Sequence, residues 1–213
     1  MILNVLNLYS ERGEFFLKLA IQHLQISAIA ILIATIIGLI LGIVISEFKG
    51  TSTIIMSLVN FIYTIPSISL LGFLIPLSGI GNGTAIIALT VYALLPMVRN
   101  TYTGIDSIDP DIIEASKGMG STRFQILYKV KLPLALMVIL SGFRNMVTMT
   151  IALAGIASFI GAGGLGVAIY RGITTNNQAM TVAGSILIAV MALVFDFILG
   201  RIEKSIKKKR RLI

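Results

Sequence analysis

Residues 114–133 read EASKGMGSTRFQILYKVKLP and form the one long polar passage that separates hydrophobic segments of the chain. Asp109 and Pro110 precede it and predict the start of a helix, because Asp is a favoured N-cap and Pro fits the first helical turn. Gly118 and Gly120 then predict a break in this helix. The passage is therefore expected to begin as a short helix at a membrane surface.

A second helix is predicted after the break, over the sequence TRFQILYKVK. Ser121 or Thr122 can cap its N-terminus, and the helix is expected to end before Pro133. The two short helices have too little apolar surface to be buried alone, yet they display side chains such as Ile112 and Met119. We therefore expect a protruding helical elbow that docks on another protein.

The composition is that of an all-α integral membrane protein with one domain. Of the 213 residues, 56% are hydrophobic and 12% are charged, with a mean hydropathy of +0.97. Soluble domains carry about 25% charged residues, and long continuous apolar runs favour helices over a barrel. The sequence has no Cys and one His, His23, so it offers little material for a metal site or an acid–base site. We expect no catalytic residues and no cofactor in this chain.

About five transmembrane helices are predicted, and small residues at fourfold spacing in the first one predict close packing against a neighbouring helix. The expected order is an interfacial segment at 1–23, spans at 24–46, 54–77, 84–98, 134–160 and 178–200, a polar loop at 99–131 and a basic tail at 201–213. The small residues are Ala30, Ala34, Gly38 and Gly42.

Three residues inside these spans are candidates for a translocation path. Pro66 frees a backbone carbonyl, so it marks either a kinked helix along the path or a purely structural kink. Arg144 and Asn145 lie roughly 15 Å into the fourth span at helical rise. A charge at that depth has to face protein or water. Arg144 is therefore expected to point inward, either toward the path or into a structural ion pair.

Basic residues predict the orientation of the spans. The tail holds seven cations against Glu203, and placing it inside puts 13 of the 17 Lys and Arg residues on the cytoplasmic side. This arrangement obeys the positive-inside rule. It places the N-terminus outside, and it places the loop at 99–131 and the C-terminus in the cytoplasm. The tail is expected to anchor on anionic lipid rather than to bind nucleic acid.

No nucleotide-binding motif is identified. Gly161, Gly163 and Gly166 match G-x-G-x-x-G, but no strand precedes them and no acidic residue follows about twenty positions later. A turn buried in protein or lining a cavity is the better interpretation. The sequence also lacks the phosphate-binding pattern G-x-x-x-x-G-K-[ST]. Energy for pumping would therefore come from a partner.

The polar passage resembles the EAA loop of ABC importer permeases. That pattern is Glu-Ala-Ala, three residues, Gly, nine residues, Ile, any residue and Leu-Pro. Every spacing is kept here, with two conservative departures, Ser116 for Ala and Val130 for Ile. The matching residues are Glu114, Ala115, Ser116, Gly120, Val130, Leu132 and Pro133.

The resemblance implies the type I importer fold in a prokaryotic cytoplasmic membrane. It implies a second or sister permease, cytoplasmic ABC ATPases that bind ATP and Mg, and an extracytoplasmic substrate-binding protein. The EAA loop would dock in a groove of an ATPase. Its expected coupling residues are Glu114, Ala115, Ser116, Gly118, Gly120, Leu132 and Pro133.

A finer resemblance concerns SGFRN at 141–145 and IGAGGLGVAIYRGI at 160–173. These segments look like the quaternary-amine branch, which imports glycine betaine, carnitine and choline. Two alternatives stay open at this point. The chain could carry another betaine-like or amino-acid-like solute, or it could be a channel or anchoring subunit that is not coupled to an ATPase.

Overall fold

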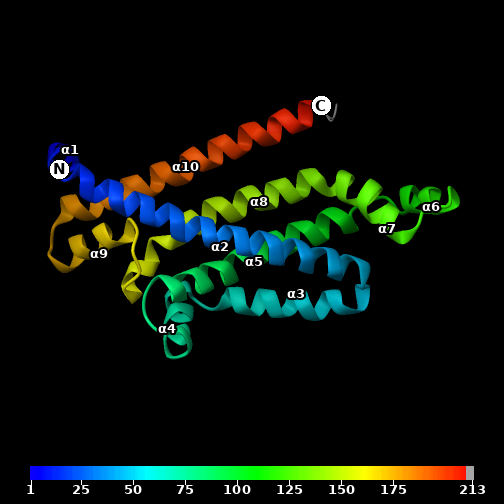
Figure 1. Ribbon diagram of the computed structural model, residues 1–213, viewed down its shortest axis with the longest axis horizontal. Helices are drawn as coiled ribbons and strands as arrows, with labels where there is room; N and C mark the ends of the chain where they lie inside the picture. Colours follow the sequence, from blue (N-terminus) through cyan, green and yellow to red (C-terminus); the bar gives the residue numbers. More distant parts are fainter. Residues whose placement is uncertain (210–213) are drawn as a thin grey trace.

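A computed structural model describes residues 1–209, apart from the side chain of Lys49, as a bundle of α-helices (Figure 1). Four helices are long and apolar enough to cross a membrane, and a bent helix pair would make a fifth span. The α-helices are α1 (Ile2–Glu11), α2 (Gly13–Glu47), α3 (Lys49–Thr64), α4 (Ser67–Ser78), α5 (Asn82–Asp106), α6 (Pro110–Gly118), α7 (Arg123–Ile126), α8 (Leu132–Ala154), α9 (Gly166–Thr174) and α10 (Gln178–Lys209).

The centre of the bundle is the contact of α2 with α5, which the small-residue stripe makes possible. Ala30 and Ala34 are fully buried. A Cβ at Gly38 would lie 2.7 Å from Met97 Cβ, and one at Gly42 would lie 2.5 Å from Thr101 Cβ. Only glycine lets the two backbones approach so closely at these two positions. The stripe therefore acts as the predicted packing face.

The second predicted span is broken rather than kinked. Its two halves, α3 and α4, meet at an angle of 99° around Ile65 and Pro66. Pro66 lacks the N–H that a continuous helix would need, and the Tyr92 hydroxyl of α5 donates a hydrogen bond to the Ile65 carbonyl. The span predicted over 54–77 is therefore a helix pair broken at Pro66, and its second half runs across the bundle.

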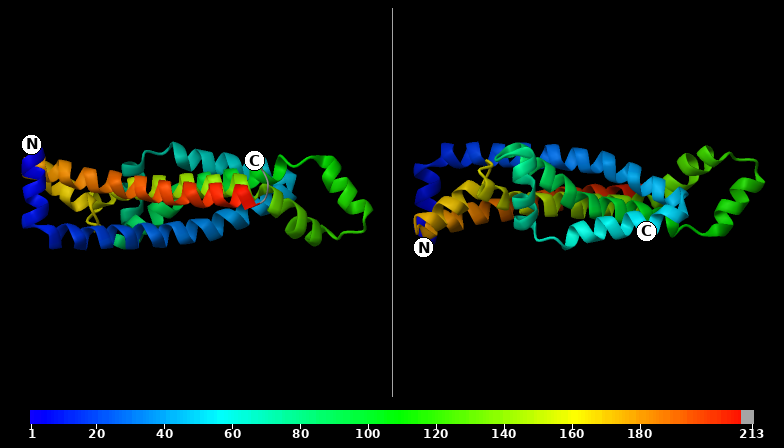
Figure 2. Two further views of the ribbon diagram at one scale, coloured as in Figure 1. Left: turned by 90° about the horizontal axis from the view of Figure 1, so that it is seen from above. Right: turned by 90° about the horizontal axis from the view of Figure 1, so that it is seen from below.

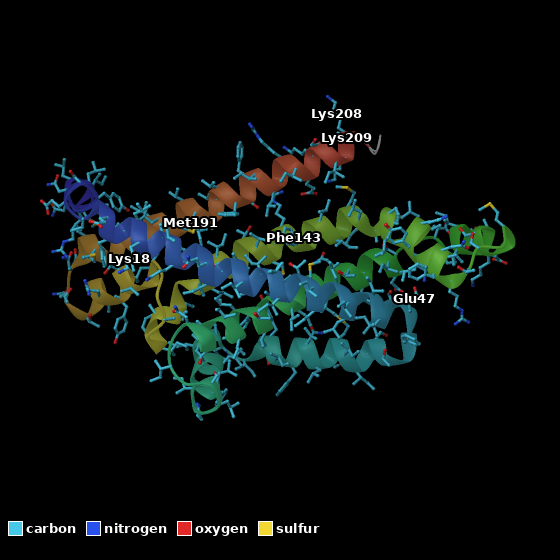
Figure 3. The ribbon with its side chains drawn as sticks, in the orientation of Figure 1. Lys18, Glu47, Phe143, Met191, Lys208 and Lys209 are labelled. Carbon is cyan, nitrogen blue, oxygen red and sulfur yellow. The ribbon has the colours of Figure 1, made fainter. Side chains whose placement is uncertain are left out.

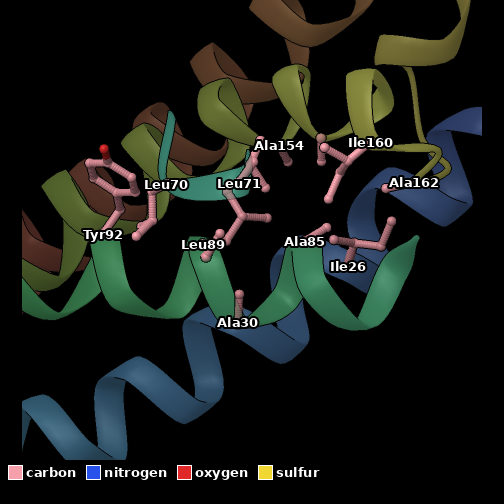
Figure 4. Packing of buried hydrophobic residues seen from close by; sticks show 12 residues of the cluster. Ile26, Ala30, Leu70, Leu71, Ala85, Leu89, Tyr92, Ala154, Ile160 and Ala162 are labelled. Atoms are coloured by element: carbon pink, nitrogen blue, oxygen red, sulfur yellow. The ribbon is translucent and has the colours of Figure 1, made fainter. Parts of the chain in front are cut away.

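Figure 4 shows the apolar core that holds this second half in place. Leu70 and Leu71 of α4 pack against Ala85 and Leu89 of α5, together with residues from α2 and from the 3₁₀ turn at Ile156–Ile160. The packing of Leu70 and Leu71 on α5 thus stabilises α4 in an orientation that a straight continuation of α3 would not allow. The bend is fixed by tertiary packing as well as by Pro66.

The N-terminal segment belongs to the bundle. Phe16 and Leu19 are buried in one cluster with residues of α9 and α10, and the Tyr9 hydroxyl donates a 2.8 Å hydrogen bond to the Ala183 carbonyl. Burial also raises the pKa of Tyr9, which keeps this donor protonated. Residues 13–23 continue directly into the first span as part of α2. The segment at 1–23 is therefore packed against the bundle on one side, and its interfacial position stays a prediction.

Helix ends also differ from the predicted spans, because apolar composition does not mark where hydrogen bonding stops. α5 continues to Asp106 beyond the predicted end at 98, and α8 ends at Ala154 instead of 160. α10 runs on to Lys209, so most of the predicted tail is helical. Arg210 and Arg211 lie outside the described residues.

The Gly-rich return at 161–166 is held by amide side chains from two helices. Asn82 Oδ1 accepts a 2.8 Å hydrogen bond from the Gly163 N–H, and Gln22 Oε1 accepts a 3.4 Å bond from the Gly164 N–H. Gly161 and Gly164 have φ values of +75° and +95°, which favour glycine. The turn is a packed structural element of the bundle.

Candidate functional site

The first arm of the elbow is α6, whose start is fixed by the predicted cap. Asp109 Oδ1 accepts a 2.9 Å hydrogen bond from the Asp111 N–H, and Pro110 occupies the first helical turn. The helix ends at Gly118, and Gly120 has a φ of +77°. A residue with a Cβ is strained at that φ. The break is therefore encoded mainly at Gly120.

The second arm starts at Thr122, which forms a capping box. Its Oγ1 accepts a 3.3 Å hydrogen bond from the Gln125 N–H, and Gln125 Oε1 accepts a 2.8 Å bond from the Thr122 N–H. Of the two residues that sequence allowed, Thr122 is the cap and Ser121 is not. Two backbone donors at the turn are satisfied locally, so the elbow keeps its shape as it projects beyond the bundle (Figure 2).

The predicted end of the second arm before Pro133 is wrong. α7, a π-helical turn at Leu127–Lys131 and α8 form one helical run from Arg123 to Ala154. Pro133 sits in the first turn of α8. The wider π turn just before it accommodates a residue that cannot donate a backbone hydrogen bond. Leu132 packs against the apolar core of α2, α5 and α8, so it belongs to the bundle more than to the elbow surface.

The exposed tip of the elbow is apolar and aromatic. Met119, Phe124 and Tyr128 are 79%, 75% and 66% exposed. Phe124 and Tyr128 stack with centroids 6.4 Å apart and an interplanar angle of 4°. Sequence reasoning missed this aromatic pair, although the i, i+4 spacing on a predicted helix was a usable signal. Such a protruding surface is typical of a docking site.

Under the tip, the elbow frames a hollow of about 490 Å³ against the ends of α2 and α5. Glu114 and Lys117 line it from α6, and Lys131 lines it from the π turn. Lys131 Nζ also lies 2.5 Å from Glu47 Oε1 at the end of α2, and Figure 3 labels Glu47 at this end of the bundle. This ion pair ties the base of the elbow to the first span.

The remaining predicted coupling residues divide between the surface and the interior of α6. Ala115 is exposed, and Gly118 has open space where a Cβ would be. Ser116 is buried, and its hydroxyl donates a 2.7 Å hydrogen bond to the Ile112 carbonyl. The Ser116 carbonyl accepts a 3.2 Å bond from the Ser121 N–H. Ser116 thus stabilises the turn, whereas Glu114 and Ala115 are available to a partner.

Arg144 forms an ion pair with α10. Its Nε and Nη2 lie 2.7 and 2.6 Å from the two Asp196 carboxylate oxygens, and its Nη1 lies 3.4 Å from Glu203 Oε2. Gly200 provides the space, since a Cβ there would lie 3.0 Å from Arg144 Cζ. Of the two expectations for Arg144, the structural ion pair is the arrangement present. The sequence did not identify its partners, which lie 52 and 59 residues away.

Asn145 and Pro66 take no part in the Arg144 ion pair. Asn145 is exposed, and its side chain forms no hydrogen bond with any of the residues that the structure describes. Pro66 is exposed at the bend between α3 and α4. The three predicted path residues therefore do not form one cluster.

Comparison with known proteins assigns the family. The family model described as "Binding-protein-dependent transport system inner membrane component" matches residues 34–208. The glycine betaine/carnitine/choline transport system permease protein OpuCD of Bacillus subtilis (strain 168) is 42% identical over 206 residues, which covers 95% of this chain and 90% of the relative. The osmoprotectant import permease protein OsmW of Salmonella typhimurium is 40% identical over 198 residues, with 91% and 92% coverage.

A solved structure agrees with this assignment. A chain of the MetNI methionine ABC transporter, in an inward-facing conformation, superposes with a TM-score of 0.83 at 25% identity, and the match covers 89% of this chain and 95% of that chain. Fold, family model and full-length relatives coincide, and the predicted all-α importer-permease fold is confirmed. The chain therefore belongs to the family of inner membrane components of binding-protein-dependent transport systems.

Proposed function

We propose that this chain is the permease subunit of an ATP-driven importer for quaternary amines such as glycine betaine, carnitine or choline. The observation that carries the proposal is the capped, protruding elbow at 109–133, set on a bundle with an importer-permease fold. In this role the chain provides the path, and partner ATPases supply the energy by binding ATP with Mg.

The elbow is the contact that we assign to the ATPase. Its stacked aromatic pair and Met119 present a compact apolar surface for a groove. Glu114 and Lys117 add charges beside it. Because the second arm continues into α8 without a break, movement of an ATPase against the elbow would be passed directly to a membrane span.

The substrate class is proposed from the relatives. Those that cover more than nine-tenths of this chain at about 40% identity carry names that specify glycine betaine, carnitine, choline or osmoprotectants. A second candidate is an amino-acid-like solute, which the resemblance to the methionine transporter chain supports at lower identity. An extracytoplasmic binding protein and a second or sister permease complete the proposed importer.

The test is purification of the tagged chain from its native membrane with its bound subunits. We expect an ABC ATPase to co-purify, together with a membrane-tethered binding protein that binds betaines in a titration. Recovery of the chain without an ATPase would overturn the importer proposal in favour of a channel or anchoring subunit. Recovery with a binding protein that binds only amino acids would support the second candidate.

A further inference from the structure

We propose that α3, α5 and α8 carry a two-layer site for a zwitterion with a quaternary ammonium and a carboxylate. One layer is aromatic and holds the ammonium, and the other is polar and holds the carboxylate. The first consists of Tyr63, Tyr92 and Met149, and the second consists of Asn60, Arg99 and Asn145. The inference rests on the proposed function and locates the substrate within the permease.

The aromatic layer is held together by direct contacts among the three helices. Tyr63 and Tyr92 form an edge-to-face pair with centroids 5.7 Å apart. The Tyr63 hydroxyl lies 3.3 Å from the Met149 sulfur. Tyr92 is buried and its hydroxyl is engaged by the Ile65 carbonyl, whereas Tyr63 is 41% exposed. The Tyr92 ring is thus fixed within the bundle, whereas the Tyr63 ring is partly exposed on the side that we call the open side of the site.

The polar layer is joined to the aromatic one through the same helices. Arg99 Nη2 donates a 3.2 Å hydrogen bond to Asn60 Oδ1, and Asn60 lies one turn before Tyr63. Asn145 lies one turn before Met149 on the same side of α8. Gly142, one turn before Asn145 on α8, packs closely against Asn100, the neighbour of Arg99. Arg99, Asn60 and Asn145 therefore lie at one level of the bundle.

The two layers follow one another along the long axis of the bundle. α3 and α8 both run away from the elbow end and α5 runs toward it (Figure 1). All three polar residues are consequently displaced toward the elbow from their aromatic or thioether neighbours. On α3 and α8 the displacement is three and four residues, or about 4.5 to 6 Å at helical rise. On α5 it is seven residues, or about 10.5 Å, but the Arg99 guanidinium bonds Asn60 and so lies at the level of that residue. This spacing suits a small zwitterion whose two charges are a few bonds apart.

The exposure of the polar residues indicates that the side of the bundle carrying Arg99 and Asn145 is not covered by lipid. Arg99 and Asn145 are both exposed on spanning helices. An exposed guanidinium or amide on a spanning helix is tolerated where it faces water or protein and is costly in hydrocarbon. The open side of the two layers therefore faces a neighbouring subunit or the water at the cytoplasmic mouth of a path, where the predicted orientation places Arg99.

The chemistry of each layer suits one end of the ligand. A trimethylated ammonium donates no hydrogen bond, so aromatic ring surfaces and a polarisable sulfur are the groups that attract it. Arg99 uses one donor on Asn60 and has others for a carboxylate, which guanidinium binds through two bonds. Asn145 adds an amide donor with no competing partner among the described residues.

The experiment is uptake by the complete importer, reconstituted with its ATPase and binding protein, for carnitine, glycine betaine and choline. Arg99→Gln should lower carnitine and betaine uptake at least about tenfold and leave choline within about twofold, because choline has no carboxylate. Arg99→Lys should recover part of the loss. Tyr63→Leu should lower uptake of all three substrates, and Tyr63→Phe should not.

Arg12→Gln removes an exposed cation at the far end of the molecule and is the matched control. Equal losses of choline and carnitine uptake in Arg99→Gln would overturn the carboxylate layer. The same layer would be overturned if the wild-type importer carried choline but neither carnitine nor glycine betaine. Equal uptake by Tyr63→Leu and wild type would overturn the aromatic layer. A wild-type importer that carries none of the three substrates would instead refute the proposed function.

Discussion

At Gly120 a single backbone angle shapes the contact surface for the proposed ATPase. Its φ of +77° lies in the left-handed region, and open space surrounds the position of a Cβ. Gly120→Ala should therefore cost roughly 1–2 kcal/mol of local strain without any clash. We expect the elbow to lose its turn, and both ATPase co-purification and uptake to fall.

Gly83→Ala is the control, because Gly83 is helical, equally open and outside the predicted coupling residues. It should assemble and transport as the wild type does. If Gly120→Ala also assembled and transported normally, the conformation at Gly120 would be irrelevant to coupling.

At Arg144 the pairing with Asp196 predicts a specific rescue. Arg144→Leu leaves the Asp196 carboxylate without its main partner, so the thermal midpoint of the purified protein in detergent should fall. Arg144→Leu combined with Asp196→Leu removes both charges and should recover part of that loss. If the loss in the double variant equalled the sum of the losses in Arg144→Leu and Asp196→Leu alone, the two residues would not be coupled.

At the scale of helices, the α2–α5 contact depends on the absence of a side chain. Gly42→Ala would place a Cβ 2.5 Å from Thr101 Cβ and 3.0 Å from the Val98 carbonyl oxygen. Overpacking of this kind typically costs about 1–3 kcal/mol. A lower thermal midpoint is expected for Gly42→Ala. Gly72→Ala in α4 meets nothing within 4 Å and should match or slightly exceed the wild type.

Local features of the helices were predictable from sequence, whereas features fixed by distant contacts were not. Asp109, Thr122 and Gly120 act on neighbours within a few residues, so the elbow could be described in advance. The 99° bend at Pro66 also needs Tyr92 and the packing of α4 on α5. The ion pair of Arg144 needs α10 to lie alongside α8. Neither distant contact leaves a periodic signal in the chain.

At the scale of the whole molecule, the absence of Cys allows the predicted orientation to be measured directly. Thr175 is exposed and follows α9, which lies at the end of the bundle that carries the N-terminus (Figure 1). Lys208 is exposed toward the free end of α10 (Figure 3). A membrane-impermeant maleimide should label Thr175→Cys in intact cells and Lys208→Cys only after the cytoplasmic side is opened. The unlabelled wild type is the control, and the reverse pattern would invert the topology.

The π-helical turn at Leu127–Lys131 also sets the rotational phase between the elbow and α8. A π turn is an α-helix that carries one extra residue. Deleting one residue there would restore regular hydrogen bonding and would turn everything before it by about 100° around the helix axis. The Phe124–Tyr128 surface would then face a different direction at almost unchanged height. The number of residues between the Thr122 cap and α8 therefore determines the direction in which the elbow surface faces. Substitutions in this segment should be tolerated far better than insertions or deletions.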